Sequence, residues 1–459
     1  MEYVSTRGAA GNISFLEAIL SGLAPDGGLY VPTIWPEIPN AGLLGSAEFP
    51  EIAARVLAPF AGGDFSEDAI RAMAERAFGS FDHPSTTPLR KLSDGTYLLE
   101  LFHGPTLAFK DVAMQLLSEF YSAAIEATGD RKTIIGATSG DTGGAAIHAF
   151  ADKPNVEVFM LHPKGRISDV QRRIMTTNTA GNIHNIAVDG SFDTCQKIIK
   201  DLFGDEAISG RLALSAVNSI NWVRLAIQQT YYFRAIAELG EAADFVVPTG
   251  NFGDIYAGYV AKKTGLSVGD LIIAVNENDI MHRVIETGDY HPKGVLPTTS
   301  PSMDIQVASN FERLLYDVTG RDVERTAMWM QSLKEAGTFA LDPDTLSDIR
   351  ASFSSGRASR EDVAGKIKAV LEADGYLVDP HTAVGLHVAK QKLKTGRPTV
   401  VLATASPAKF PEAVIDACGE HPPLPERYAD LHLRKEACAY ADATSASVRD
   451  LILATSAFA

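Results

Sequence analysis

The stretch TYLLELFHGPTLAFKDVAMQLLSEF, residues 96–120, indicates the fold more directly than any other part of the chain. Residues 96–101 predict a strand. Helical spacing begins just after Lys110, with apolar side chains at Val112, Leu116, Leu117, Phe120 and Ala124. A strand that leads directly into a helix is the repeating unit of parallel-sheet α/β folds, so this junction predicts that class.

Lys110 lies in the first turn of the predicted helix. A cation there opposes the helix dipole, and Leu107, Ala108 and Phe109 make its surroundings apolar, so both effects favour the neutral amine. A neutral lysine is a nucleophile toward aldehydes, which a Schiff-base lysine must be. The alternative is that Lys110 reaches solvent and pairs with Asp111.

Strand-like runs alternate with helical stretches from about residue 95 onward. The runs are apolar along their length, as in strands covered by helices on both faces: TYLLEL, KTIIGA, VEVFML, IHNIAV, DFVVP, LIIAV and TVVLAT. They predict an α/β protein with two parallel sheets. Residues 14–80 and 320–375 show helical spacing, and residues 288–304, rich in proline and glycine, predict a long loop.

A second strand-to-helix junction is KTIIGATSGDTGGAAIHAF, residues 132–150. The predicted strand ends at Ala137, and the next helix has two glycines in its first turn. Hydroxyl and carboxyl side chains lie between them, at Thr138, Ser139, Asp141 and Thr142. Glycines and the free N–H groups of a helix start can bind an anion such as an amino-acid carboxylate. The alternative is a well-capped turn without a ligand.

A third junction, DFVVPTGNFGDIYAGYVAKKTG at residues 244–265, has the composition of a phosphate-binding loop. After a strand that ends at Val247 come Gly250, Asn251, Phe252, Gly253 and Asp254, and a helix opens at about Ile255. The GxGxxG spacing of dinucleotide folds and the lysine–hydroxyl pair of nucleotide P-loops are both missing. A monophosphate attached to another group is the better match.

Two further segments carry polar side chains for a ligand. Residues 217–233 place Asn218, Ser219, Asn221 and Arg224 around a helix start, and residues 162–173 carry Lys164, Arg166, Arg172 and Arg173. Such amide and basic groups could hold a second phosphate, or they could be solvated surface. The strand that ends at Ala403 is followed by Thr404 and Ser406, hydroxyls that could bond a ring nitrogen or serve a structural role.

Composition limits the class of partner. The 459 residues suffice for two or three domains. A net charge of −16 repels phosphate backbones and anionic lipids, which argues against nucleic acid and membranes as partners. Cys195, Cys418 and Cys438 are far apart in sequence and predict neither a disulfide framework nor a zinc site. With an N-terminus that lacks a secretory pattern, they predict a cytoplasmic protein.

Together, an aldehyde-reactive lysine, a monophosphate loop, a carboxylate turn and a neutral hydroxyl for a pyridine nitrogen predict a pyridoxal phosphate site. The segments HGPTLAFKD, TSGDTGG, NSINWVR and PTGNFGD, with YVSTRG and APDGGLYVP near the N-terminus, resemble threonine synthases of the long bacterial and fungal type. The resemblance runs over nearly the whole chain. It implies the fold of the tryptophan synthase β-subunit family, with two α/β domains around the cofactor and an N-terminal extension.

The resemblance also implies roles for individual residues. Lys110 would hold pyridoxal phosphate, residues 250–254 would bind its phosphate, and Thr404 would face the pyridine nitrogen. Ser139, Asp141 and Thr142 would hold the substrate carboxylate or the cofactor hydroxyl, although related enzymes often have asparagine where this chain has Asp141. The substrate-binding set is completed by Arg166, Asn218, Ser219, Asn221 and Arg224.

The implied domains are an N-terminal helical region at residues 1–92, a large cofactor-binding domain at 93–111 and 215–459, and a small domain at 112–214. The implied reaction converts O-phospho-L-homoserine and water to L-threonine and phosphate in a monomer or homodimer. Three alternatives remain: a dehydratase or β-replacing synthase of the same fold, which needs no second anion site, a catalytically silent relative, and a doubly wound protein with another ligand.

Overall fold

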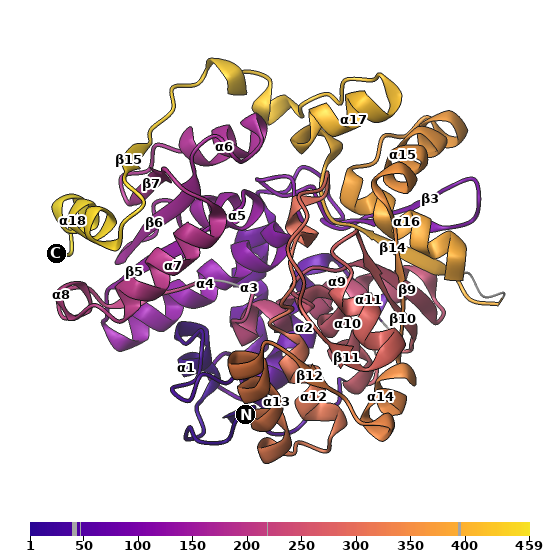
Figure 1. Cartoon of the computed structure of the whole chain (residues 1–459), viewed down its shortest axis with the longest axis horizontal. Helices are drawn as coiled ribbons and strands as arrows, with labels where there is room; N and C mark the ends of the chain where they lie inside the picture. The colour runs from indigo at the N-terminus through magenta and orange to yellow at the C-terminus, as the bar shows by residue number, and fades with distance from the viewer. Residues whose placement is uncertain (39–43, 46, 218, 393–395) are drawn as a thin grey trace.

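The computed structural model describes residues 1–38, 44–45, 47–217, 219–392 and 396–459. Two parallel sheets with helices on their faces make up most of it, and a mostly helical N-terminal region packs against them (Figure 1). The predicted α/β class with two sheets is therefore confirmed.

The larger sheet contains the first of the predicted strands. Its six strands are β3 (Leu89–Lys91), β4 (Tyr97–Glu100), β9 (Ala243–Pro248), β10 (Val268–Val275), β13 (Phe353–Arg357) and β14 (Thr399–Ala403). In space their order is β13-β10-β9-β14-β4-β3, and every neighbouring pair is parallel except β3 with β4. Since β4, β14 and β9 are adjacent and parallel, the loops that follow them emerge at one edge.

Helices cover both faces of this sheet, as its apolar strands require. On β9, Phe245 and Val247 pack into the core shared with α9 (Trp222–Leu239) and α10 (Gly253–Lys263), whereas Val246 faces the core shared with α15 (Arg360–Asp374) and α16 (Pro380–Lys392). The alternation follows from the two-residue period of a strand.

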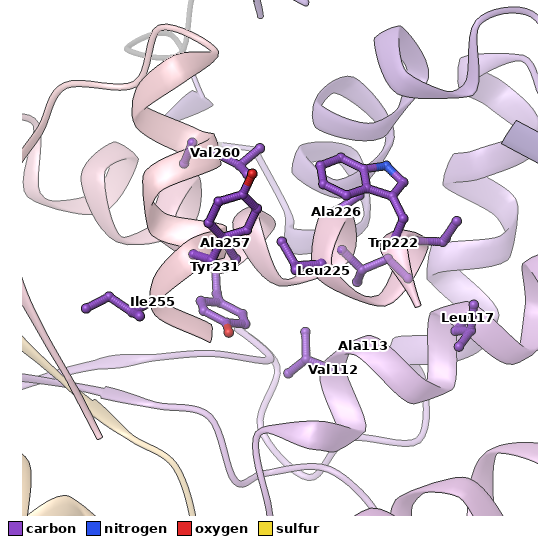
Figure 2. Close-up of a cluster of buried hydrophobic side chains, with 14 of the residues drawn as sticks. Val112, Ala113, Leu117, Trp222, Leu225, Ala226, Tyr231, Ile255, Ala257 and Val260 are labelled. Atoms are coloured by element: carbon purple, nitrogen blue, oxygen red, sulfur yellow. The ribbon is translucent and has the colours of Figure 1, made fainter. Parts of the chain in front are cut away.

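The helix that begins with Lys110 is anchored by the same core. Figure 2 shows side chains of α4 (Lys110–Thr128), α9 and α10 meeting in one cluster, among them Val112 of α4, Leu225 of α9 and Ala257 of α10. Trp222 is 1% exposed, and Val112, Leu225 and Ala257 are fully buried. This packing fixes the start of α4 relative to the starts of α9 and α10.

The smaller sheet is parallel throughout and has the order β15-β7-β6-β5-β8. Its strands are β5 (Lys132–Ala137), β6 (Val156–Pro163), β7 (Ile183–Val188), β8 (Leu214–Ser215) and β15 (Ala439–Ala441). The helices that follow these strands or pack beside them are α5 (Asp141–Phe150), α6 (Asp169–Thr176), α7 (Phe192–Phe203), α8 (Glu206–Ser209) and α18 (Ser445–Thr455).

The C-terminal end of the chain departs from the sequence prediction. The sequence places all of residues 215–459 in the large domain, yet β15 pairs with β7 and α18 packs on α7. Figure 1 shows this yellow segment crossing from α17 (Pro411–Cys418) to the magenta smaller sheet. A three-residue strand such as β15 carries too little pattern to reveal its partner. The other domain limits stay a prediction.

The remaining elements frame the two sheets. The N-terminal region has α1 (Phe15–Leu20), α2 (Phe49–Ala61), α3 (Glu67–Phe78) and a small sheet of β1 (Tyr3–Ser5) with β2 (Tyr30–Pro32). Residues 280–350 add α11 (Ile280–Thr287), β11 (Asp289–Tyr290), α12 (Phe311–Val318), α13 (Val323–Ala336), β12 (Phe339–Ala340) and α14 (Pro343–Arg350). The prediction of helix over residues 320–375 is wrong at β13, an edge strand whose sequence FSSGR is too polar to signal one.

The docking of the C-terminal helix gives a stability prediction. Ile452 of α18 is fully buried against the smaller sheet in a cluster with Phe159 and Val188. Replacing Ile452 with Ala should lower the free energy of unfolding by about 2–4 kcal/mol, because the neighbours cannot fill the space. Denaturant unfolding measures the change, with Leu433→Ala as control. Leu433 is 88% exposed, and an equal loss in both variants would contradict the packing.

Candidate active site

Lys110 stands where the loop after β4 meets α4. The loop runs beside the end of β14: the Phe109 N–H donates to the Thr404 carbonyl oxygen (2.8 Å), and the Ser406 N–H donates to that of Leu107 (3.0 Å). The two segments, about 300 residues apart in sequence, are therefore joined by backbone hydrogen bonds. Thr404 and Lys110 accordingly lie at the same sheet edge.

The Lys110 amine is buried and bound to an acid on another helix. Lys110 is 8% exposed, and its Nζ lies 3.1 Å from Oδ2 of Asp141 and 3.2 Å from Oγ of Ser302. Asp111 binds the N–H and hydroxyl of Thr106 instead. The alternative in which Lys110 reaches solvent and pairs with Asp111 is therefore wrong.

Asp141 has a second cationic neighbour. Its Oδ1 lies 2.6 Å from Nζ of Lys409 and accepts a hydrogen bond from Nε2 of Gln171 (2.9 Å). Asp141 is 4% exposed, and Lys409 is 1% exposed. Burial works to raise the pKa of Asp141, but Lys110 and Lys409 outweigh it and hold that pKa well below its ordinary value.

For Lys110, by contrast, burial outweighs the attraction of the opposite charge. Burial is the largest cause and lowers the pKa of Lys110; Lys409 and Arg224 lower it further, against the opposing pull of Asp141. The predicted shift toward a neutral amine is confirmed in direction. Its cause is desolvation together with neighbouring cations.

Ser302, the other partner of Lys110, comes from the predicted long loop at residues 288–304. Its hydroxyl donates to Oδ2 of Asp141 (2.9 Å), and its N–H donates to Nε2 of His381 (3.3 Å). Nδ1 of His381 lies 2.6 Å from Oδ2 of Asp379, which is fully buried. The Asp379–His381 pair thus orients the residue that contacts Lys110.

The predicted phosphate loop lies directly beside Ser302. A Cβ on Gly250 would lie 2.5 Å from the Ser302 carbonyl oxygen, so only glycine fits there. Phe252 has a φ of 65° and precedes α10, which begins at Gly253. The first-turn N–H groups of a helix have no partner within the helix, so this loop has the donors of an anion site.

Asn310 joins the phosphate loop to the segment before α9. Its Nδ2 donates to the carbonyl oxygens of Asn251 (3.0 Å) and Ser219 (3.1 Å). Asn251 itself is exposed, and Ser219 is half-buried. Two segments that the sequence singled out separately are therefore held side by side.

The carboxyl group of Asp254 is engaged within the protein. Oδ1 accepts hydrogen bonds from the hydroxyls of Tyr231 and Tyr232 on α9. Burial raises the pKa of Asp254 to about 7, against the opposing effect of these hydrogen bonds. What Asp254 can offer a phosphate is its backbone N–H in the first turn of α10, rather than its side chain.

Arg224 is a buried cation with a free donor. It is 3% exposed, and its Nη1 has no hydrogen-bond partner among the described residues. Burial lowers its pKa to about 10. Gln228, one turn further along α9, would lie 3.7 Å from a Cβ on Gly253, so this face of α9 is turned to the phosphate loop. An unpaired guanidinium in this position is suited to an anion.

The turn after β5 is capped by its own threonine side chain. The Thr138 hydroxyl accepts the N–H groups of Gly140 and Gly143 (both 2.9 Å) and so caps the turn. Gly140 has a φ of 133°, and a Cβ there would lie 2.6 Å from Gln171. Ser139 and Thr142 are half-buried beside Asp141. The cap is structural, and a ligand role for Ser139 and Thr142 stays a prediction.

Several predicted ligands have other tasks. Asn221 caps α9 through the N–H of Val223 (3.0 Å) and donates to the Ile19 carbonyl oxygen (3.0 Å). Its amide is therefore committed to the fold, which corrects its assignment to the substrate. Arg172 and Arg173 form ion pairs with Asp169 and Glu436, so they are poor candidates for a second anion site.

The ligand roles predicted for Arg166 and Asn218 stay predictions. Arg166 is exposed after β6, and no hydrogen bond or ion pair found for the described residues connects it to Lys110. Asn218 lies outside the described residues.

Sequence reasoning missed Lys409, Gln171, Ser302, Asn310, Asp379 and His381. Two of them carried a usable signal. Lys409 follows β14 within a few residues, beside the predicted site residue Thr404, and Ser302 belongs to the long loop predicted at residues 288–304. The others lie inside helical or capping patterns that give no separate cue.

No described helix is long and apolar enough to cross a membrane. No group of three or more histidine, cysteine or acidic side chains in the same residues could hold a metal ion.

Family models match three successive parts of the chain. The model described as "Threonine synthase N terminus" matches residues 2–78, "Pyridoxal-phosphate dependent enzyme" matches residues 81–345, and "Threonine synthase, C-terminal" matches residues 382–452. The second of these covers more than half of the chain.

Individual threonine synthases are similar to this chain over nearly their whole length. Threonine synthase of Pseudomonas aeruginosa is 44% identical over 95% of both chains. The crystal structure of threonine synthase with bound PLP from Brucella melitensis has a TM-score of 0.97 and 48% identity and covers 100% of both chains. Yeast threonine synthase has a TM-score of 0.93 and 36% identity over 99% of this chain and 98% of its own. The chain belongs to the threonine synthase family of pyridoxal-phosphate dependent enzymes.

Proposed function

We propose that the protein converts O-phospho-L-homoserine and water to L-threonine and phosphate. The observation that carries the proposal is a buried lysine that contacts Ser302, which in turn lies against the glycine loop at Gly250, in a chain of this family. The two anion-binding groups, the loop and Arg224, suit a phosphorylated cofactor and a phosphorylated substrate together.

The residues present fit pyridoxal phosphate. Lys110 would hold its aldehyde carbon, the backbone of residues 250–254 would hold its phosphate, and Thr404 would face its ring nitrogen. The support is the close approach that only glycine allows at Gly250 and the placement of Thr404 one hydrogen bond from Phe109. When bound, pyridoxal phosphate withdraws electrons from Cα of an amino acid and stabilises the carbanion there.

The protein's own groups would supply the proton transfers. Lys110 would remove the proton from Cα of the substrate, pass it on within the site, and then take one from Cβ, so that phosphate leaves Cγ. Protons returned to Cγ and to Cα, with water added at Cβ, complete threonine. Burial of the site keeps water away until that step.

The substrate itself would be held at its two charged ends. Ser139 and Thr142 would bind its carboxylate, supported by their position beside Asp141 at the start of α5. Arg224 would bind its phosphate with Ser219 nearby, supported by its unpaired buried guanidinium. We propose further that the enzyme acts in the cytoplasm as a monomer or homodimer and that its domains follow the limits predicted above, apart from β15 and α18.

Replacing Lys110 with Ala should abolish turnover, because both the covalent anchor and the proton carrier are lost. Phosphate and threonine are measured in the same reaction, and the wild-type protein should form them in equal amounts. A Lys110→Ala enzyme with most of its activity would contradict the role of Lys110. Wild-type phosphate release with a keto acid instead of threonine would contradict the proposed reaction.

Arg224→Met should raise the KM for O-phospho-L-homoserine about 10- to 100-fold, the loss expected for hydrogen bonds to a charged group. Arg224→Lys keeps the charge and should raise KM less. Arg173→Met serves as control, because that guanidinium is already bound by Asp169. Unchanged KM with weaker pyridoxal phosphate binding would instead assign Arg224 to the cofactor.

Asp254 predicts a pH dependence of stability. Its pKa rises from 3.8 to about 7 on folding, so between these pH values the native state binds more protons than the unfolded chain. The contribution of Asp254 to the free energy of unfolding therefore falls as the pH rises through that range, and it is constant above it. Unfolding experiments with the cofactor-free protein should show that Asp254→Asn removes this part of the decline. Parallel pH curves for both proteins would show that Asp254 does not titrate in this way.

A further inference from the structure

Lys409 is a second buried lysine on the carboxylate that binds Lys110. Its Nζ lies 2.6 Å from Oδ1 of Asp141 and donates to the Thr106 carbonyl oxygen at 2.7 Å. The corresponding distances from Nζ of Lys110 are 3.1 Å to Asp141 and 3.2 Å to Ser302. Lys409 is thus the more tightly held of the two lysines.

The placement of Lys409 is built into the fold. The residue closes a short helix (Pro407–Lys409) just after β14, and its carbonyl oxygen accepts the Ser168 hydroxyl at 2.9 Å. Its position therefore depends on both the larger sheet and the start of α6. Nζ of Lys409 is held by Asp141 and by the Thr106 carbonyl oxygen together, whereas Lys110 must leave Asp141 during a catalytic cycle.

Charge balance assigns different tasks to the two lysines. A buried carboxylate needs a cation, and an unpaired buried charge is costly. With Lys409 present, the Lys409–Asp141 pair is neutral as a unit, and Lys110 is free to lose its proton. Without Lys409, Lys110 would be the only lysine beside Asp141, and the carboxylate would stabilise Lys110 as an ammonium ion.

We propose that Lys409 is the permanent counter-ion of Asp141 and thereby keeps Lys110 available as a reactive neutral amine. The inference rests on the proposed function, because it concerns the capture of pyridoxal phosphate by Lys110. Lys409 is argued to act through Asp141, to which its Nζ is bound, so it is a positioning residue.

Other charged groups also surround Lys110 and the Lys409–Asp141 pair. Arg224 on α9 repels its protonated form, and Asp254 on α10 attracts it. His381 on α16 faces Asp141, and Asp111 on α4 faces Lys409. All of these stay in place when Lys409 or Asp141 is replaced, so a matched pair of variants isolates the contribution of the Lys409–Asp141 pair.

The test is the pH dependence of covalent pyridoxal phosphate capture by the cofactor-free protein. Capture is followed by absorbance, and the label is located at Lys110 by peptide mass after borohydride reduction. Lys409→Met should move the midpoint of the rate profile upward by about one pH unit or more and slow capture about tenfold at neutral pH, because less neutral amine is present. Lys409→Arg keeps the charge and should retain most of the wild-type rate.

Asp141→Asn should shift the midpoint of the rate profile in the opposite direction. It removes the anion and leaves Lys409 as a cation beside Lys110, so the midpoint should move downward. A purely structural defect would instead slow capture in both variants without moving their midpoints in opposite directions. This second variant keeps the inference testable if Lys409→Met fails to fold.

The outcomes separate the two proposals. If the wild-type protein does not capture pyridoxal phosphate at Lys110, the proposed function fails. If it does, but Lys409→Met keeps the wild-type midpoint or Asp141→Asn shifts upward, the assignment of Lys409 is overturned. Opposite shifts with rescue by Lys409→Arg support it.

Discussion

The active site depends on one buried carboxylate, that of Asp141, which is shared by two lysines. Asp141 stands at the first position of α5, Lys110 at the first position of α4, and Lys409 just after β14. Asp141 and Lys409 are 4% and 1% exposed, so the charges of this pair must balance each other, and the Lys110 amine lies against the same carboxylate. The relative placement of these three elements is therefore fixed by electrostatics as well as by apolar packing.

The fold brings these groups together through its strand order. The adjacent parallel strands β4, β14 and β9 deliver Lys110, Thr404 and the phosphate loop to one edge of the larger sheet. The packing of α4, α9 and α10 then fixes the starts of these helices relative to one another (Figure 2). Arg224 belongs to this arrangement, because the same α9 that fills the core also carries the unpaired guanidinium.

Much of the fold and the centre of the site could be predicted from the sequence, because those signals are local. A strand, a glycine-rich or hydroxyl-rich turn and a helix start lie within about twenty residues of one another, and this made Lys110, the 250–254 loop and the Asp141 turn visible. Lys409, Ser302 and His381 reach the same site from distant segments, so only the strand order reveals them. Asn221 was wrongly predicted to bind the substrate, because asparagine is also a common helix-capping residue. The edge strands β13 and β15 were missed because β13 has the polar sequence FSSGR and β15 is only three residues long.

The central claim is that phosphate leaves by elimination and that water is then added to carbon. Turnover of O-phospho-L-homoserine in water enriched in the heavy isotope of oxygen tests this claim most directly, with mass spectrometry of both products. The account predicts the heavy isotope in the hydroxyl group of threonine and none in the released phosphate. Heavy oxygen in the phosphate, with homoserine as the other product, would show hydrolysis at phosphorus and would contradict it.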